Sequence, residues 1–276
     1  MRIDSHQHFW HYEPEKHAWI DDEMAAIRRD FTPADLQPTL AANGIDGCVA
    51  VQADQTTAET DFLLGLAGEH DFIRGVVGWI DLRADDLPAR LEAYADARKL
   101  VGWRHVVQGE PDPLFLLRPD FLRGIETIGR AGYTYDILIF PHQLVSSLEL
   151  VRRFPDQKFV IDHLAKPYAK LGYFEGWAAG LRAVAAYENT YCKLSGLVTE
   201  ADYRNWTTEQ LLPYLELALE WFGPERVMFG SDWPVSRVAA EYSQLVDLVE
   251  RATSWCSAAE RAAIFGGNAV KFYGLG

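Results

Sequence analysis

The sequence has only three cysteines, Cys48, Cys192 and Cys256, and it lacks a long hydrophobic run. Three scattered cysteines provide neither a disulfide framework nor the paired spacing of a zinc ribbon. No stretch approaches the ~20 apolar residues that cross a membrane. The first ten residues also lack the apolar run of a signal peptide. We therefore expect a cytoplasmic protein without a membrane partner.

Basic residues are scarce as well. Lys and Arg together number 26 against 40 Asp and Glu, which gives a net charge of −14. Such a charge repels phosphate backbones, so we expect no nucleic-acid partner. The sequence also lacks a Gly-x-Ser-x-Gly nucleophile elbow, and this absence disfavours catalysis through a covalent acyl-enzyme.

Hydrophobic residues, by contrast, make up 49% of the 276 residues, enough for the core of one domain spanning residues 1–276. Short β-rich runs alternate with helical patterns, and several runs are continuously apolar, which is typical of strands buried on both faces. Eight strands with helix-length connections predict the α/β class, as a (β/α)8 TIM barrel. The oligomeric state stays open, a homo-oligomer included. The expected strands cover residues 2–8, 47–52, 73–80, 100–107, 133–140, 158–162, 190–194 and 226–232, and the last two helices cover 239–252 and 258–273.

The first expected strand carries two histidines near its end. Asp4, His6 and His8 are spaced two residues apart, and residues at that spacing in a strand share a face. The two imidazoles should therefore project side by side. Solvated histidines are the alternative interpretation, but His is a frequent metal ligand and acid–base residue. In the loop that follows, His17 is expected to be solvated.

Polar residues also gather where the other expected strands end. In a (β/α)8 barrel the active site lies at the C-terminal ends of the strands. Ionisable groups there would be costly to bury without partners. Each has a structural alternative, such as an ion pair for the basic residues or core packing for the tryptophans. The candidates are Trp103, Arg104 and His105 on the fourth strand, Asp136 on the fifth, Asp162, His163 and Lys166 at the sixth, Lys193 on the seventh, and Asp232 and Trp233 at the eighth.

The ends of three expected strands, the first, the sixth and the eighth, carry a family resemblance. With His-x-His on the first strand, Asp-His on the sixth and Gly-Ser-Asp-Trp-Pro on the eighth, the chain resembles the amidohydrolase superfamily (amidohydrolase-related, family 2). It looks most like the sugar-lactonase branch, which includes L-fuconolactonase and L-rhamnonolactonase. The resemblance covers essentially the whole chain, through the stretches DSHQHFW, GWRHVVQ, YDILIFPHQL, VIDHLAKP, CKLSGLV and MFGSDWPVS.

The resemblance implies hydrolysis of a sugar lactone to an aldonic acid. His6, His8 and His163 would surround and polarise the lactone carbonyl, and Asp232 would be the general base that activates water. A carboxylate such as Asp136 suits hydroxyl donors and repels carboxylate substrates, so a neutral polyol lactone is favoured. The residues expected to bind the substrate are Arg104, His105, Asp136, Lys166, Trp103 and Trp233.

The expected metal content depends on two positions at which this sequence differs from the binuclear members of the superfamily. Binuclear superfamily members use a bridging lysine or glutamate on strand four and a histidine on strand five. Here those strands carry Arg104 and Asp136, which disfavours two metal ions. Three histidines and one aspartate still suit a single divalent cation such as Zn²⁺, so the cofactor question stays open. The ligands of that cation would be His6, His8, His163 and Asp232.

Three other functions remain as alternatives. A metal-dependent decarboxylase of the same superfamily would use the same His-x-His and release CO₂. A dicarboxylate lactone hydrolase would call for an arginine-rich pocket. A catalytically silent barrel would bind sugar acids or lactones without turnover, which the intact set of three histidines and Asp232 disfavours.

Overall fold

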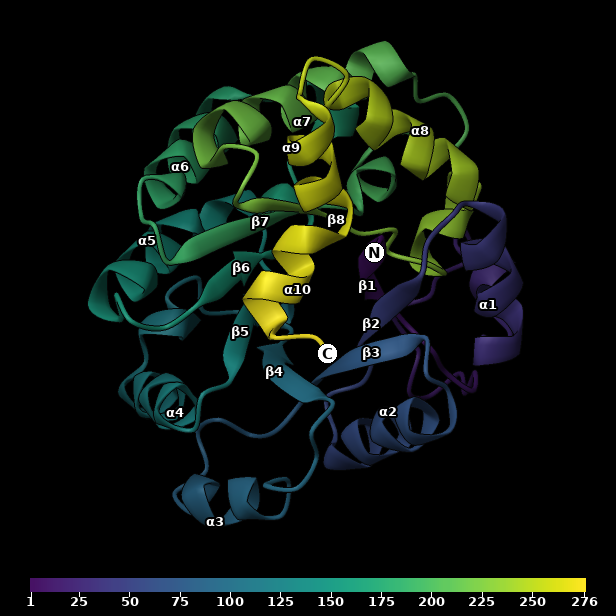
Figure 1. Ribbon diagram of the computed structural model, residues 1–276. Helices are drawn as coiled ribbons and strands as arrows, with labels where there is room; N and C mark the ends of the chain where they lie inside the picture. The colour runs from purple at the N-terminus through teal and green to yellow at the C-terminus, as the bar shows by residue number, and fades with distance from the viewer.

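The computed structural model describes residues 1–276, and its eight parallel strands pair in sequence order to form a barrel (Figure 1). An isolated bridge joins Gln7 to Trp233, and the Asp232 amide donates to the His6 carbonyl at 2.8 Å, so the first and last strands meet. The predicted (β/α)8 barrel is confirmed. The strands are β1 (Ile3–Gln7), β2 (Gly47–Val51), β3 (Ile73–Gly78), β4 (Leu100–His105), β5 (Thr134–Ile137), β6 (Phe159–Ile161), β7 (Thr190–Leu194) and β8 (Val227–Phe229).

Helices surround the barrel between successive strands (Figure 1). The first helix begins where its sequence signals it, because Thr32 and Asp35 form a capping box and Pro33 occupies the first turn. No helix is long and apolar enough to cross a membrane. The helices are α1 (Pro33–Ala42), α2 (Thr57–Glu69), α3 (Leu87–Glu92), α4 (Pro119–Arg130), α5 (Leu144–Arg153), α6 (Glu175–Ala185), α7 (Thr208–Phe222), α8 (Tyr242–Ala252), α9 (Ala258–Ala262) and α10 (Asn268–Tyr273).

Two hydrophobic cores stabilise the fold. The larger core includes the strand side chains that face the helices. The smaller core includes Ile3 and Tyr191, which stand near the starts of their strands, together with Phe272, Tyr273 and Leu275 from the chain end. Figure 1 shows α10 lying across this end of the barrel. The barrel is therefore plugged at its N-terminal end, and functional groups are left to the opposite end.

The C-terminal region differs from the single helix expected over 258–273. A π-helical turn at residues 263–267 separates α9 from α10. A Cβ atom at Gly266 would lie 2.2 Å from the Met1 carbonyl oxygen, so this glycine allows the turn to contact the chain start. The close approach of two distant segments ends the helix, and helical periodicity carries no signal of it.

The loop after β1 is anchored to the segment that precedes α1. Trp10 pairs with Phe31 through an isolated bridge, which folds the loop back on itself. His17 is only 4% exposed, and its ring packs against Trp10 and Tyr12 with centroid distances of 5.7 Å each. The expectation of a solvated His17 is therefore wrong, because neighbouring aromatic residues enclose the ring.

Candidate active site

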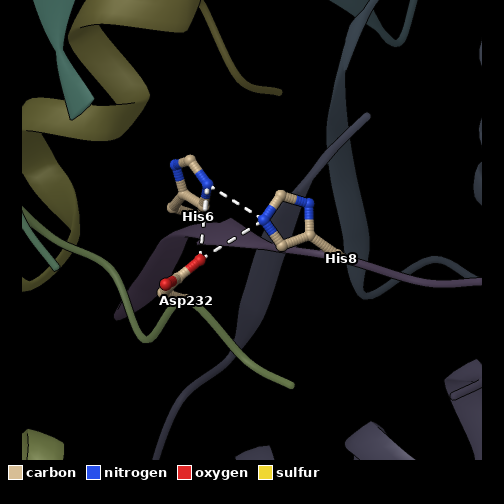
Figure 2. A group of neighbouring side chains, drawn as sticks. All are labelled: His6, His8 and Asp232. Carbon is tan, nitrogen blue, oxygen red and sulfur yellow. Dashed lines mark hydrogen bonds and ion pairs between the residues drawn. The ribbon is translucent and has the colours of Figure 1, made fainter. Parts of the chain in front are cut away.

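Four side chains converge at the C-terminal end of the barrel around one carboxylate oxygen. Asp232 Oδ1 lies 3.3 Å from His8 Nε2 and 3.8 Å from both His6 Nε2 and His163 Nε2. Figure 2 shows His6, His8 and Asp232 facing one another. None of the four residues is more than 5% exposed. The structure thus brings together all four residues proposed as catalytic from the sequence.

An irregularity in β1 directs its two histidines. The pairing register of β1 with β2 shifts between Asp4 and Gln7, as a bulge does, and such an irregularity re-aims side chains. Asp4 therefore does not share the face of His6. Its carboxylate accepts hydrogen bonds from Ser231 and from Tyr242 of α8 instead.

His163 and Asp232, the other two members of the cluster, are positioned by backbone in the left-handed conformation. His163 through Lys166 have φ between +50° and +57°, and Asp232 has a φ of +57°. This conformation costs a non-glycine residue roughly 1–2 kcal/mol. The Trp177 indole donates a hydrogen bond to the Leu164 carbonyl at 2.6 Å and so stabilises the turn at residues 163–166. Strained backbone of this kind concentrates at functional sites, and here it presents His163 to Asp232.

Gly196 follows β7 and lies directly against the cluster. A Cβ atom there would lie 2.4 Å from His163 Nδ1 and 3.1 Å from Asp232 Oδ2. The residue also has a φ of +60°, which favours glycine. The preceding Ser195 hydroxyl lies 2.8 Å from His163 Nδ1. Gly196 carries no signal in the sequence, since its importance depends on contacts with residues that are distant along the chain.

Beneath the cluster lies a buried network of charges. Lys193 Nζ contacts Asp136 Oδ2 at 2.5 Å, Asp162 Oδ1 at 2.9 Å and His6 Nδ1 at 3.0 Å. Arg104 Nη1 contacts Asp162 Oδ2 at 3.0 Å. All of these side chains are at most 4% exposed. Asp162 and Lys193 stand out in the sequence as polar residues at strand ends, but their pairing is visible only in the barrel.

Burial and these neighbours set the protonation of the cluster. Burial, followed by the charge of Lys193, lowers the pKa of His6 well below its usual value. Burial also lowers the pKa of His163 to about 4. For Asp232, burial favours the neutral form, but the charges of His163 and His6 and the hydrogen bond from His8 outweigh it and lower its pKa. At neutral pH the cluster therefore holds an ionised carboxylate beside neutral imidazoles of His6 and His163.

The carboxylates of the network behave differently from each other. Burial raises the pKa of Asp136 to about 6, although Lys193 opposes the shift. Burial acts on Asp162 in the same direction, but Lys193, His6 and Arg104 together hold its pKa well below the usual value. The Tyr273 hydroxyl donates to Asp136 Oδ2 at 2.8 Å, so α10 supplies a further hydrogen bond to that carboxylate.

Three residues proposed to bind substrate point away from the cluster. Trp103 is fully buried and packs against Tyr94 and Tyr133. His105 bonds to Glu110 and stacks on Phe115. Successive strand residues alternate sides, so the inward direction of Arg104 turns both neighbours toward the helices. The ring of Trp233 similarly packs against Phe9 and Phe31, in the hydrophobic core.

Lys166 stands apart at the rim of the site. Its Nζ lies 3.1 Å from Glu200 Oε1, and the two side chains are 16% and 14% exposed. The charge of Lys166 contributes to the low pKa of His163, after burial and against nearby carboxylates. Lys166 also approaches the Phe140 ring at 5.8 Å. Glu200 was not identified from the sequence, because no motif links it to Lys166.

Part of the cluster suits a divalent cation. Donor atoms of His6, His8 and Asp232 all lie within 4.8 Å of one another, as do those of His6, Asp162 and His163. Imidazole nitrogens and a carboxylate oxygen are ligands that Zn²⁺ prefers. The residues present therefore can hold such an ion.

Comparison with known proteins agrees with this geometry. The amidohydrolase family profile matches residues 3–275. The chain is 43% identical to L-fucono-1,5-lactonase of Burkholderia multivorans, with 100% of this chain and 96% of the relative aligned. It is 37% identical to L-fucono-1,5-lactonase of Burkholderia ambifaria, over 99% of this chain and 95% of that one.

Solved structures give the same relationship. Crystal structures of an amidohydrolase from Burkholderia multivorans, one with bound Hepes and one with bound zinc, superpose with a TM-score of 0.96 at 41% identity. Each alignment covers both chains completely. The family profile over residues 3–275 and the full-length relative at 43% identity show that this chain belongs to the amidohydrolase family.

Proposed function

We propose that this protein hydrolyses a sugar lactone of the L-fucono-1,5-lactone type to the corresponding aldonic acid. The observation that carries the proposal is an ionised, buried Asp232 among three imidazoles, in a chain 43% identical over its full length to an L-fucono-1,5-lactonase. A lactone is an activated ester and needs less polarisation of its carbonyl than an amide does.

Asp232 is the general base of the proposed reaction. It accepts a proton from water while the water oxygen bonds to the lactone carbonyl carbon. The carbonyl oxygen becomes an oxyanion, which imidazole N–H groups of the cluster stabilise. The bond from the carbonyl carbon to the ring oxygen then breaks, and Asp232 returns the proton to the leaving oxygen. One water is consumed, and one carboxylic acid and one hydroxyl are formed.

His6, His8 and Asp232 are the residues that would hold a divalent cation. When bound, such an ion would supply Lewis-acid polarisation of the carbonyl and lower the pKa of a bound water. His163 stays outside this set of three and keeps its contact with Ser195. His163 would therefore remain free to donate to the oxyanion.

Lys166 and Glu200 are the groups we assign to the sugar hydroxyls. Together they offer ammonium donors and a carboxylate acceptor, and hydroxyl groups bind to both. Their slight exposure at the rim supports this assignment. Arg104 and Asp136, which are also expected to bind substrate, contact His6 and Lys193, and we assign them to the support of these two side chains.

The Lys166–Glu200 pair also bears on the dicarboxylate alternative. Its two charges cancel, whereas a dicarboxylate requires uncompensated cations. Decarboxylation gains no support from the two Burkholderia relatives, both of which are lactonases by name. A neutral lactone therefore remains the proposed substrate.

A pH-stat assay over neutral sugar lactones, a dicarboxylate lactone and hydroxybenzoates tests the proposal. We expect turnover of neutral lactones only, and an Asp232→Asn variant should lose about 10²–10⁴-fold in kcat. Asp247→Asn, at an exposed position on α8, is the matched control and should retain full activity. Release of CO₂, or full activity of the Asp232→Asn enzyme, would overturn the assignment.

A further inference from the structure

The barrel closes at a seam where β8 and β1 meet, and this seam pairs differently from the rest of the sheet. Consecutive strands from β1 to β8 are joined by parallel ladders, whereas β8 and β1 share one isolated bridge, between Gln7 and Trp233. Just beyond β8, Asp232 has a left-handed φ of +57°, which a strand does not adopt. A strand ladder therefore does not set the position of His6 relative to Asp232.

The side chain of Asp4 crosses this seam. Its Oδ1 accepts two backbone N–H groups, from His6 at 3.1 Å and from Ser231 at 2.9 Å. The amide of Asp232, the next residue along the chain, donates to the His6 carbonyl at 2.8 Å. Both backbone groups of His6 are thus joined to the Ser231–Asp232 segment, one directly and one through Asp4.

The other oxygen of Asp4 is held by two hydroxyl groups. Oδ2 accepts from Ser231 Oγ at 2.5 Å and from the hydroxyl of Tyr242, on α8, at 2.9 Å. Ser231 Oγ also accepts from the Trp233 amide at 3.0 Å while its own proton goes to Asp4. These contacts fix the orientation of the carboxylate, and α8 supports it from outside the barrel.

The chemistry of this position calls for an acceptor. Asp4 is 0% exposed, and its partners are amides and hydroxyls rather than cations. Burial of a carboxylate without a cation is costly. An apolar side chain would avoid that cost, but it would leave the buried amides of His6 and Ser231 without an acceptor. One oxygen that reaches two amides on opposite sides of the seam satisfies both.

The seam also transmits small displacements directly to the catalytic cluster. A Cβ atom at Gly230 would lie 2.9 Å from His6 Cβ, so the two segments are in close contact. Asp232 Oδ1 lies 3.3 Å from His8 Nε2 and 3.8 Å from His6 Nε2 (Figure 2). These distances depend on how the segment after β8 sits against β1.

We propose that Asp4 is a positioning residue, whose carboxylate joins the His6 and Ser231 amides across the seam and thereby sets His6 and His8 in place relative to Asp232. Asp4 touches neither substrate nor the reacting atoms and acts through the backbone alone. Its effect on catalysis rests on the proposed lactone hydrolysis, whereas the joining of the two amides does not.

Two substitutions of Asp4 separate positioning from a simple loss of stability. Asp4→Asn keeps an oxygen acceptor for both amides, so we expect kcat for a neutral lactone within about threefold of wild type. Asp4→Ala removes the acceptor, and the misplaced His6 should lower kcat about 10²-fold. KM should change less than about threefold in both variants, because Lys166 and Glu200 are unaffected. A wild-type kcat in Asp4→Ala, or an equal loss in both variants, would overturn the proposal.

Hydrogen exchange of single amides, followed by nuclear magnetic resonance, tests the connection without any substrate. In Asp4→Ala the His6 and Ser231 amides should exchange at least about tenfold faster than in wild type, relative to the Val76 amide. Val76 donates to the Lys99 carbonyl at 2.7 Å in the β3–β4 part of the barrel, away from the seam. A general loss of stability would accelerate all three amides alike, and that result would overturn the proposal. The measurement decides the point even if the protein hydrolyses no lactone.

A pair of tyrosine variants keeps the proposal testable if Asp4→Ala does not fold. Tyr242→Phe removes one of the two hydroxyls on Asp4 Oδ2, so kcat should fall about 3–10-fold and the His6 and Ser231 amides should exchange faster. Tyr214→Phe, on α7, is the matched control, because Tyr214 is 1% exposed and its hydroxyl has no hydrogen-bond partner. Its kcat and exchange rates should equal those of wild type. If Tyr242→Phe behaves like Tyr214→Phe in both measurements, the proposal is wrong.

Discussion

Gly196 shows how strongly a single residue is constrained by the cluster. Alanine there would meet both a left-handed φ of +60° and an imidazole nitrogen at 2.4 Å. We expect Gly196→Ala to lower the free energy of unfolding by about 2–4 kcal/mol, from backbone strain plus overpacking. Displacement of His163 should also reduce kcat by about 10²-fold. Urea unfolding and steady-state rates measure the two effects.

Gly172 provides the matched control for that substitution. It has a φ of +67°, but no atom lies within 4 Å of the position that a Cβ would occupy. Gly172→Ala should therefore lose only about 1–2 kcal/mol for the backbone conformation. Its kcat should equal that of wild type. If the two alanine variants have equal activity, contact with His163 is not what makes Gly196 necessary.

The protonation states of single residues predict how kcat/KM changes at acidic pH. The pKa of Asp232 is held low, so the base stays ionised as the pH falls. The pKa of His163 is lowered to about 4 by burial, so this ring becomes charged only near that pH. We expect kcat/KM to stay level from pH 8 to about 5 and to fall toward pH 4. A midpoint near the ordinary histidine value of ~6.5 would contradict this assignment.

Among the elements, α10 is the one that closes the barrel. Phe272 is 1% exposed and belongs to the smaller core. We expect Phe272→Ala to cost about 3–5 kcal/mol of unfolding free energy, since it opens a cavity. The catalytic groups lie at the opposite end, so kcat should change less than twofold. Trp255→Ala, at a side chain that is 64% exposed, should cost less than about 0.5 kcal/mol in the same urea titration.

Element order was predictable because local signals repeat along the chain. Thr32-Pro33 begins α1, and buried strands such as Gly47–Val51 appear as continuous apolar runs. The direction in which each side chain points was harder to predict. Trp103 and His105 could be assigned to the site only while the inward direction of Arg104 was unknown, because a shift of one residue moves every side chain of a strand to the other face.

The candidate site was predictable to the extent that its members stand at strand ends. His6, His8, His163 and Asp232 meet as expected because parallel strands of a barrel deliver their C-terminal ends to one place. Gly196 and Glu200 were missed, since each acts through a contact with a loop that is distant in sequence. The paired burial of Lys193 between two carboxylates likewise arises only when the barrel closes.

On the scale of the whole molecule, the charge of −14 acts differently on substrate and product. The electrostatic field of the protein neither attracts nor repels a neutral lactone, whereas it repels an aldonate anion. Salt shortens the range of that repulsion, from ~30 Å at 0.01 M ionic strength to ~10 Å at 0.1 M. We therefore expect kcat/KM for the lactone to be independent of salt, and inhibition by added aldonate to strengthen as NaCl is raised from low to physiological concentration. Initial rates with and without aldonate measure both quantities. An inhibition constant that does not change with salt would show that the buried cations Arg104 and Lys193, rather than the net charge, govern product affinity.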